Sequence, residues 1–347
     1  TILKSIKMKS GKFNFLNNTY LNQYFNVSFK DETIINMVGG SLNGSINIDK
    51  TNFIKVNLNN TRFDFDGIKL AQSNLQSDIN NLSLRFIGKN IRTKDNLIQD
   101  VDFYLLKNKN ILTIDSININ SSRLKIGPNK DNQKAYISYN SNLDLFKIKG
   151  KYRLDNSSGY FNNLSKYRFN FFETDLNIQW NSLNYLLNLE GKLDFLIKDL
   201  NLDTEIPEST FLRALRILNL NAIVEGLEDA SDDIVNINRA SGRIIVGKKR
   251  AFIEYPIVFE TDEASLKWVG EVLKNQKGEL DNLNLDLSLR LKISENIPWY
   301  AAIFGGIPAI AGGMVFENIF EDTIEDISTI NFKVQGIIDE PKIKRLN

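Results

Sequence analysis

The chain has 347 residues, a length that allows two ordinary domains or one extended architecture. Its 43 Lys and Arg residues nearly balance 42 Asp and Glu residues, so the formal net charge is +1 and no strong overall field points to nucleic acid. Cysteine and histidine are absent, which excludes thiol chemistry, thiolate or imidazole metal sites and every histidine-based triad. We therefore expect no cofactor, no metal and no nucleic-acid partner.

Residues 1–205 consist of short runs in which apolar and polar residues alternate, separated by Asn, Asp, Gly and Ser. This pattern is typical of β-strands, and clear examples are Phe25-Val27-Phe29 and Ile54-Val56-Leu58. Pro128 is the only proline before Pro207, which suits a continuous sheet because proline cannot donate to a strand ladder. The short polar connections predict an antiparallel meander without crossovers.

The longest alternating run, Leu283–Ile293, lies in a second stretch of strand pattern over residues 227–294. Its apolar residues would all face one side of a strand, and its polar residues would face the other. A similar run spans Leu187–Ile197. Together these runs predict a curved sheet whose apolar face forms a groove for an apolar ligand. The predicted groove residues are Leu187, Leu189, Leu193, Phe195, Ile197, Leu283, Leu285, Leu287, Leu289, Leu291 and Ile293.

The alternating pattern also fits two other β architectures. In a sandwich, two apolar faces would bury each other. A closed sheet in an outer membrane is disfavoured by the helical segments that interrupt the pattern. We expect a mainly β protein, with an elongated antiparallel β-sheet curved into an apolar groove, an amphipathic helix and a C-terminal apolar helical segment.

Two segments break the strand pattern. Residues 206–226 predict an amphipathic helix, because Phe211, Leu215 and Leu218 follow helical spacing just after Pro207. Residues 295–327 contain the uncharged run Ile297–Phe316 and continue as an amphipathic helix with an acidic polar face. Residues 328–347 predict a final strand and a basic tail.

The uncharged run Ile297–Phe316 is about as long as a helix that crosses the apolar core of a bilayer, roughly 30 Å. Pro308 in its middle and several glycines weaken a straight transmembrane helix, and a buried core element is the second alternative. A broken or re-entrant apolar hairpin that meets a membrane or closes the groove fits best, because Trp299 and Tyr300 are typical interface residues. The predicted membrane-facing residues are Trp299, Tyr300, Ile303, Phe304, Ile307, Ile310, Met314 and Phe316.

The sequence offers little catalytic chemistry. Gly242–Lys249 approaches the phosphate-binding loop pattern, but Lys249 replaces the hydroxyl residue that would bind magnesium, and strand-like runs lie on both sides. A hairpin turn at Gly247-Lys248 is the better interpretation. The acidic pair Asp232-Asp233 lies in a turn-like segment and does not specify a cleft with two carboxylates. We therefore expect no enzymatic activity.

The C-terminal third resembles the YhdP-like branch of the AsmA-like (AsmA/TamB) proteins. The resemblance rests on Ser209–Leu220, on the Ile237–Arg243 string INRASGR, on the Pro/Ala/Gly-rich segment Ile297–Gly313 and on the ending Val334–Ile343, in the same order and spacing. It covers roughly Glu208–Leu346. Ala240 departs from the pattern, because the family usually has a β-branched residue there, and the apolar segment is shorter and carries Trp299.

The resemblance implies a bridge-type lipid transfer protein of the bacterial periplasm that conducts phospholipid from the inner membrane toward the outer membrane. Such proteins hang from the inner membrane by an N-terminal helix. The chain begins at Thr1 without a signal peptide pattern, so we expect it to be the C-terminal part of a longer protein. Envelope proteins at either membrane are further expected partners. The alternative is a ligand-free structural or adhesive envelope protein, anchored by its C-terminal apolar segment.

Overall fold

The computed structural model describes residues 4–15, 18–63, 81–93, 97–156, 167–181, 187–202, 235–261, 264–291, 329–338 and 341–346. These residues are mainly β: 79% of them lie in strands, almost all antiparallel, and none lies in a helix. The predicted helices at 206–226 and 295–327, and the domain boundaries drawn at them, lie outside the described residues. The chain divides into two compact units, Thr1–Arg153 and Leu154–Asn347.

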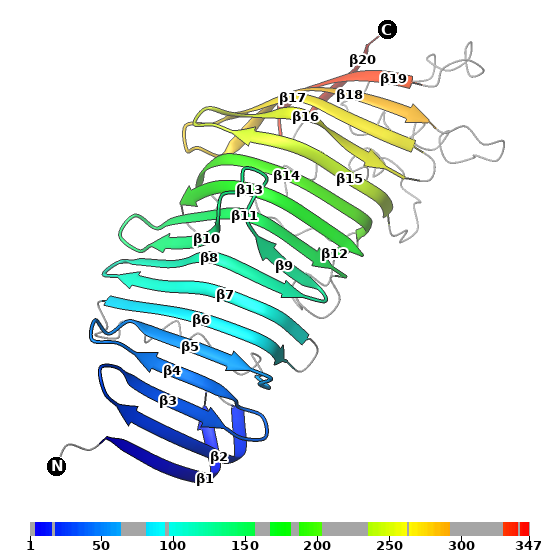
Figure 1. Ribbon diagram of the computed structural model, residues 1–347. Coiled ribbons are helices and arrows are strands. Elements are labelled where there is room, and N and C mark those ends of the chain that lie inside the picture. The colour runs from blue at the N-terminus through cyan, green and yellow to red at the C-terminus, as the bar shows by residue number, and fades with distance from the viewer. Residues whose placement is uncertain are drawn as a thin grey trace. The chain divides into compact units, whose positions relative to one another are not determined.

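The first unit is built from strands that pair as neighbours in a single layer (Figure 1). Its strands are β1 (Ser5–Phe15), β2 (Asn18–Phe29), β3 (Thr33–Val38), β4 (Gly44–Ile48), β5 (Ile54–Asn59), β6 (Asn81–Arg92), β7 (Leu97–Asn108), β8 (Ile111–Ser121), β9 (Leu124–Gly127), β10 (Ala135–Asn140) and most of β11 (Leu145–Asp155). Strand β8 pairs with both β9 and β10, and β10 pairs with β11.

One pair departs from the predicted meander, because β5 and β6 are parallel, with Ile54 beside Leu84 and Val56 beside Phe86. Two parallel strands run in the same direction, so the connection between them must lead back to the end at which the first strand began. A short turn suffices for an antiparallel pair. Residues 64–80, between these two strands in the sequence, lie outside the described part of the chain. The prediction of an antiparallel meander was therefore wrong for this pair of strands.

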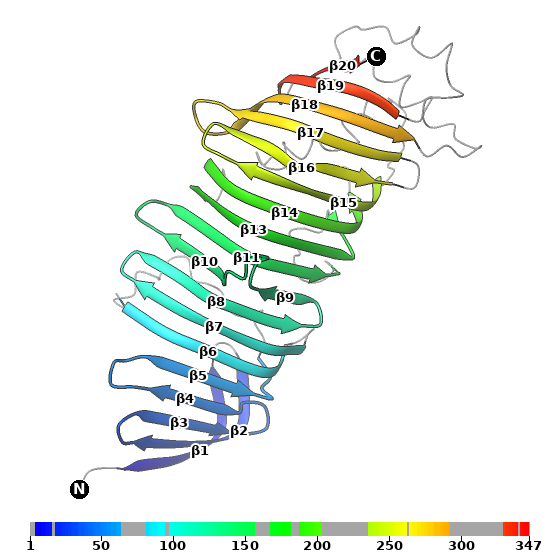
Figure 2. The ribbon, with the colours of Figure 1, turned by 45° about the horizontal axis from the view of Figure 1, so that its top comes forward.

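The second unit repeats the antiparallel arrangement (Figure 2). Its strands are β12 (Tyr167–Arg168), β13 (Phe171–Asn181), β14 (Leu187–Leu202), β15 (Val235–Val246), β16 (Arg250–Glu260), β17 (Ala264–Lys274), β18 (Leu280–Leu291), β19 (Thr329–Ile337) and β20 (Lys342–Leu346). The predicted hairpin turn is confirmed between β15 and β16, where the Gly247 N–H donates to the Arg250 carbonyl at 2.8 Å. The predicted strand through Phe332 is β19.

Several strands bend where a non-glycine residue adopts the left-handed backbone conformation. Five such residues within strands have φ of 52° or 53°, and four of them are followed by a buried residue. The pairs are Asn22 and Gln23 in β2, Asn90 and Ile91 in β6, Ser116 and Ile117 in β8, and Asp199 and Leu200 in β14. Asn and Asp suit these positions, since they tolerate this conformation far better than branched residues do. Each bend turns the next side chain inward and changes the alternation along its strand.

The core of the first unit sits at the strand ends on one side of the sheet. It comprises Tyr20, Met37, Leu42, Leu58, Phe63, Ile91 and Val101, all less than 9% exposed. Hydrogen bonds connect these ends: the Tyr20 hydroxyl donates to the Arg62 carbonyl at 3.2 Å, and Gln23 Nε2 donates to the Leu42 carbonyl at 2.7 Å. A closely packed cluster of the first unit therefore lies at a margin of its sheet.

The bend at Asn22 can be tested by substitution. Asn22→Val places a β-branched side chain in the left-handed conformation, and we expect it to lower the free energy of unfolding by about 1–2 kcal/mol. Asn22→Gly should leave the stability unchanged or slightly higher, because glycine adopts positive φ without strain. Urea unfolding followed by circular dichroism measures both variants. Equal destabilisation by valine and glycine would show that the Asn22 side chain, and not its backbone conformation, determines the free energy of unfolding at this position.

Candidate functional site

The register of the second unit brings distant apolar residues onto one face. Phe195 on β14 lies opposite Gly242 on β15, and a Cβ at Gly242 would stand 2.8 Å from the Ile257 side chain on β16. Ile257 lies opposite Trp268 on β17, which lies opposite Leu287 on β18. Residues opposite each other in a ladder share a face. This second-unit apolar face comprises Leu193, Phe195, Ile197, Ala240, Ile244, Ile257, Phe259, Leu266, Trp268, Leu283, Leu285, Leu287, Leu289, Phe332 and Val334.

Of the predicted groove residues, three on β14 and four on β18 thus belong to this face, but the two strands differ in burial. On β18, Leu283 and Leu285 are each 2% exposed, Leu287 is 3% exposed and Leu289 is 6% exposed, as in a packed core. On β14, the predicted residues with described side chains are only half-buried; they are Leu189, Leu193, Phe195 and Ile197. Leu187 and Leu291 lie in their strands with side chains that are not described, and Ile293 lies outside the described residues.

Trp268, which the sequence analysis did not single out, lies in the middle of the second-unit apolar face. Its side chain is 2% exposed, and its indole N–H has no hydrogen-bond partner among the described residues. A buried donor without an acceptor costs about 1–3 kcal/mol, so this face contains one unsatisfied polar group. The alternation Leu266-Trp268-Gly270-Val272 was the signal in the sequence that could have identified this strand and its inward side chains.

The first unit carries a second apolar face on the strands predicted from Phe25-Val27-Phe29 and Ile54-Val56-Leu58. In one row, Val27 lies opposite Ile35, Ile35 lies opposite Ile46 and Ile46 lies opposite Val56. The row continues through Phe86 to Phe103, whose rings are stacked with centroids 5.3 Å apart. This first-unit apolar face comprises Phe25, Val27, Ile35, Ile46, Ile54, Val56, Leu84, Phe86, Phe103, Leu105, Ile114, Ile137 and Ile148.

The first-unit apolar face is partly exposed to solvent. Apart from Val27, its residues are of intermediate burial, and several of them, among them Phe25, Val56 and Phe103, pack against the first-unit core. The face becomes more open toward β1, where Ile6 is 37% exposed and Met8 is 49% exposed. All described elements of this unit belong to one layer of strands, and the core lies at their ends. A row of large apolar side chains is therefore left partly exposed over many strands, which is uncommon for a sheet that only supports itself.

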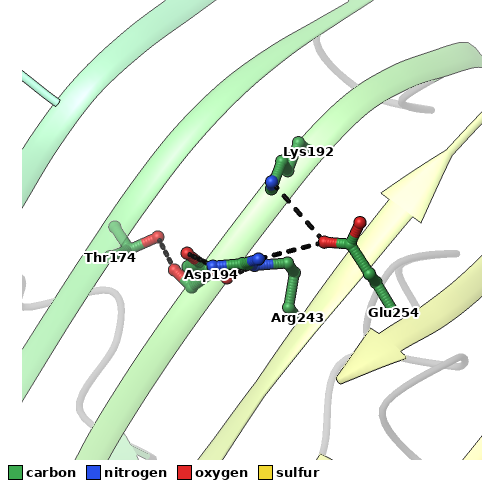
Figure 3. A network of polar contacts seen from close by, with 5 residues as sticks. All are labelled: Thr174, Lys192, Asp194, Arg243 and Glu254. Carbon is green, nitrogen blue, oxygen red and sulfur yellow. Dashed lines mark hydrogen bonds and ion pairs between the residues drawn. The ribbon is translucent and has the colours of Figure 1, made fainter. Parts of the chain in front are cut away.

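The opposite face of the second unit is polar, and its charges are paired (Figure 3). The Arg243 guanidinium binds the Asp194 carboxylate in a bidentate manner, with Nη2 donating at 2.8 Å, and also contacts Glu254 at 3.1 Å. The hydrogen bond to Asp194 holds the pKa of Arg243 above its ordinary value. Lys192 lies 3.5 Å from Glu254. The Asp194 backbone carbonyl accepts a 2.7 Å hydrogen bond from the Thr174 hydroxyl, which lies on the apolar side opposite Phe195. Two cations and two carboxylates neutralise one another, which suits a structural network.

The first unit uses the same device, since Arg85 forms a bidentate pair with Asp102 at 2.8 and 3.0 Å on its polar face. In the part of the chain that the structure describes, no group of three or more carboxylates is arranged to hold a metal ion. The candidate site is therefore an amphipathic sheet surface in each unit, with an apolar face on one side and a polar face that carries paired charges on the other.

The predicted membrane-facing residues from Trp299 to Phe316 all lie outside the described residues. Among the residues that are described, no helix is long and apolar enough to cross a bilayer. A comparison with known protein families, curated proteins and solved structures finds no match.

Leu287 distinguishes a packed interior from an open surface. We expect Leu287→Asp to lower the free energy of unfolding by about 3 kcal/mol or more, because it buries a charge in an apolar row. Ile337→Asp on neighbouring β19 is the matched control, since Ile337 is 51% exposed and its replacement should change stability by about 0.5 kcal/mol or less. Thermal unfolding measures both variants. A stable Leu287→Asp protein would mean that water reaches this face.

The Arg243–Asp194 pair should behave as a coupled unit. Arg243→Met removes charge-assisted hydrogen bonds from a carboxylate whose side chain is 15% exposed, and we expect a loss of about 2 kcal/mol. Asp194→Leu should cost a similar amount, and the double variant should be more stable than the sum of the single losses predicts. A double-mutant cycle by urea unfolding measures this coupling. Strictly additive losses would show that the two side chains act independently.

Proposed function

We propose that this chain conducts phospholipid, holding acyl chains against its apolar sheet faces while the headgroups stay in water. The observation that supports this proposal best is the first-unit apolar face, a continuous set of large side chains in one layer of strands that remains half-buried. An apolar surface of this extent on one side of a sheet fits an apolar ligand of similar length. The paired charges of the opposite face suit contact with solvent.

The size of the hydrophobic effect explains why such a face would be needed. Each methylene withdrawn from water contributes about 0.8 kcal/mol, so two acyl chains of about sixteen carbons would cost on the order of 25 kcal/mol in water. A sheet that covers the chains removes most of this barrier. It need not bind lipid more tightly than a bilayer does, because the chains are buried in both places. The chain would act as a conduit and not as an enzyme, and the energy for net flow would come from elsewhere.

We also propose where in the cell the chain acts. On the resemblance to the YhdP-like branch of the AsmA-like proteins, the conduit would lie in the bacterial periplasm between inner and outer membrane. The C-terminal run Ile297–Phe316 would meet a membrane or close the groove, and envelope proteins would position the ends. These parts of the proposal rest on the sequence alone.

The burial of β18 supports a second candidate function. Leu283, Leu285 and Leu287 are packed like the interior of an ordinary domain, so the second unit could be a structural module whose apolar face never meets a ligand. A ligand-free structural or adhesive envelope protein would need nothing more. The two functions differ in whether the first-unit apolar face contacts lipid.

Photo-crosslinking at Phe103 tests the conduit. We expect benzoylphenylalanine at Phe103, on the first-unit apolar face, to form a covalent adduct with phospholipid in bacteria, detected by mass spectrometry. Tyr104 is the matched control, because it is the next residue of β7 and contacts Arg85 on the polar face, with the guanidinium 5.1 Å from the ring centroid. Both replacements exchange one aromatic ring for another, so the fold should tolerate both.

Adducts at Phe103 and none at Tyr104 would support conduction along the first-unit apolar face. Lipid adducts at both positions would indicate nonspecific contact with membranes. A folded protein with no lipid adduct at Phe103 would overturn the conduit and favour the structural function.

A further inference from the structure

The polar side of the sheet carries lysines and exposed apolar side chains together at its β1 end. By register, Lys9, Tyr24 and Val38 form one row across β1, β2 and β3, on the side opposite the first-unit apolar face. Tyr24 is 50% exposed and Val38 is 63% exposed. Lys12 lies opposite Leu21, which is 60% exposed. We call Lys7, Lys9, Lys12, Leu21, Tyr24 and Val38 the β1–β3 patch.

The charge of this patch is not compensated nearby. Residues 1–30 contain five lysines and neither Asp nor Glu. The first carboxylates, Asp31 and Glu32, lie in the β2–β3 turn, and Asp31 already pairs with Lys50 at 2.9 Å. Within the described ranges, no ion pair involves Lys7, Lys9 or Lys12, and the nearest special contact is a cation–π approach of Lys9 Nζ to the Tyr24 ring, 5.3 Å from its centroid.

We propose that the β1–β3 patch docks on the surface of an anionic phospholipid bilayer. Lysines near such a surface are attracted to its headgroups, and exposed Leu, Val and Tyr side chains can enter the interfacial region between them. This combination is a poor match for a protein partner, since lysine is depleted from protein interfaces. Nucleic acid is also a poor match, because the most exposed apolar side chains of the patch are aliphatic and do not stack on bases. The proposal does not rest on lipid conduction.

Co-sedimentation of the full chain with vesicles tests the docking. The probes are vesicles of phosphatidylethanolamine with phosphatidylglycerol, and vesicles of phosphatidylethanolamine alone. We expect Lys7→Gln/Lys9→Gln/Lys12→Gln to weaken binding to the anionic vesicles by about a hundredfold and to leave binding to the neutral vesicles unchanged. Leu21→Ser/Val38→Ser should weaken the binding that persists at high salt.

The matched control is Lys248→Gln/Lys249→Gln/Lys277→Gln, which makes the same change in net charge at three exposed lysines of the second unit. This control also separates the patch from membrane contact made by other parts of the chain, because those contacts are intact in both triple variants. Normal binding of the control together with weak binding of the patch variant would support the proposal. Equal binding of the two triple variants would overturn it. Binding of the wild type to polyglutamate or duplex DNA but not to anionic vesicles would also overturn it.

Discussion

The structure depends on one constraint: a strand places successive side chains on opposite sides, and its neighbours must keep the same register. When apolar residues occupy every second position over many strands, a single layer acquires one apolar face and one polar face. Both units follow this rule, with Ile46 and Val56 sharing a row in the first and Trp268 and Leu287 sharing one in the second. The fold therefore produces a large apolar surface whatever its purpose is.

The bends bury part of the apolar face, and the paired charges neutralise part of the polar face. A flat ribbon would leave its apolar face open along its whole length, whereas residues such as Asn22 and Asn90 turn strand ends inward and create a buried margin at Tyr20 and Ile91. On the polar side, the Arg243–Asp194 pair neutralises charges that lie on adjacent strands. The margin and the cross-strand pairs thus contribute to stability, and the first-unit apolar face packs against the margin while staying partly exposed.

The two units use this design differently. The first-unit apolar face is half-buried, whereas the β18 side of the second-unit apolar face is packed to a few per cent exposure. The first-unit apolar face is therefore better suited to contact an apolar ligand than the β18 side of the second. The runs from Leu187 and from Leu283 had identified apolar strands of the second unit correctly, but alternation alone carries no information about what covers a face. The half-buried rows through Val56 and Phe103 were consequently missed as candidate site residues.

The sequence by itself determined the β class, the positions of strands such as β2, β5 and β18, the hairpin at Gly247, and which residues of each strand are apolar. These are local properties, set by side-chain alternation and turn chemistry. Only the tertiary structure decided the parallel pairing of β5 with β6, the register that places Phe195 on the face of Leu287, and the burial that separates Leu287 from Phe103. Pairing and burial depend on contacts between residues far apart in the chain, which no local pattern specifies.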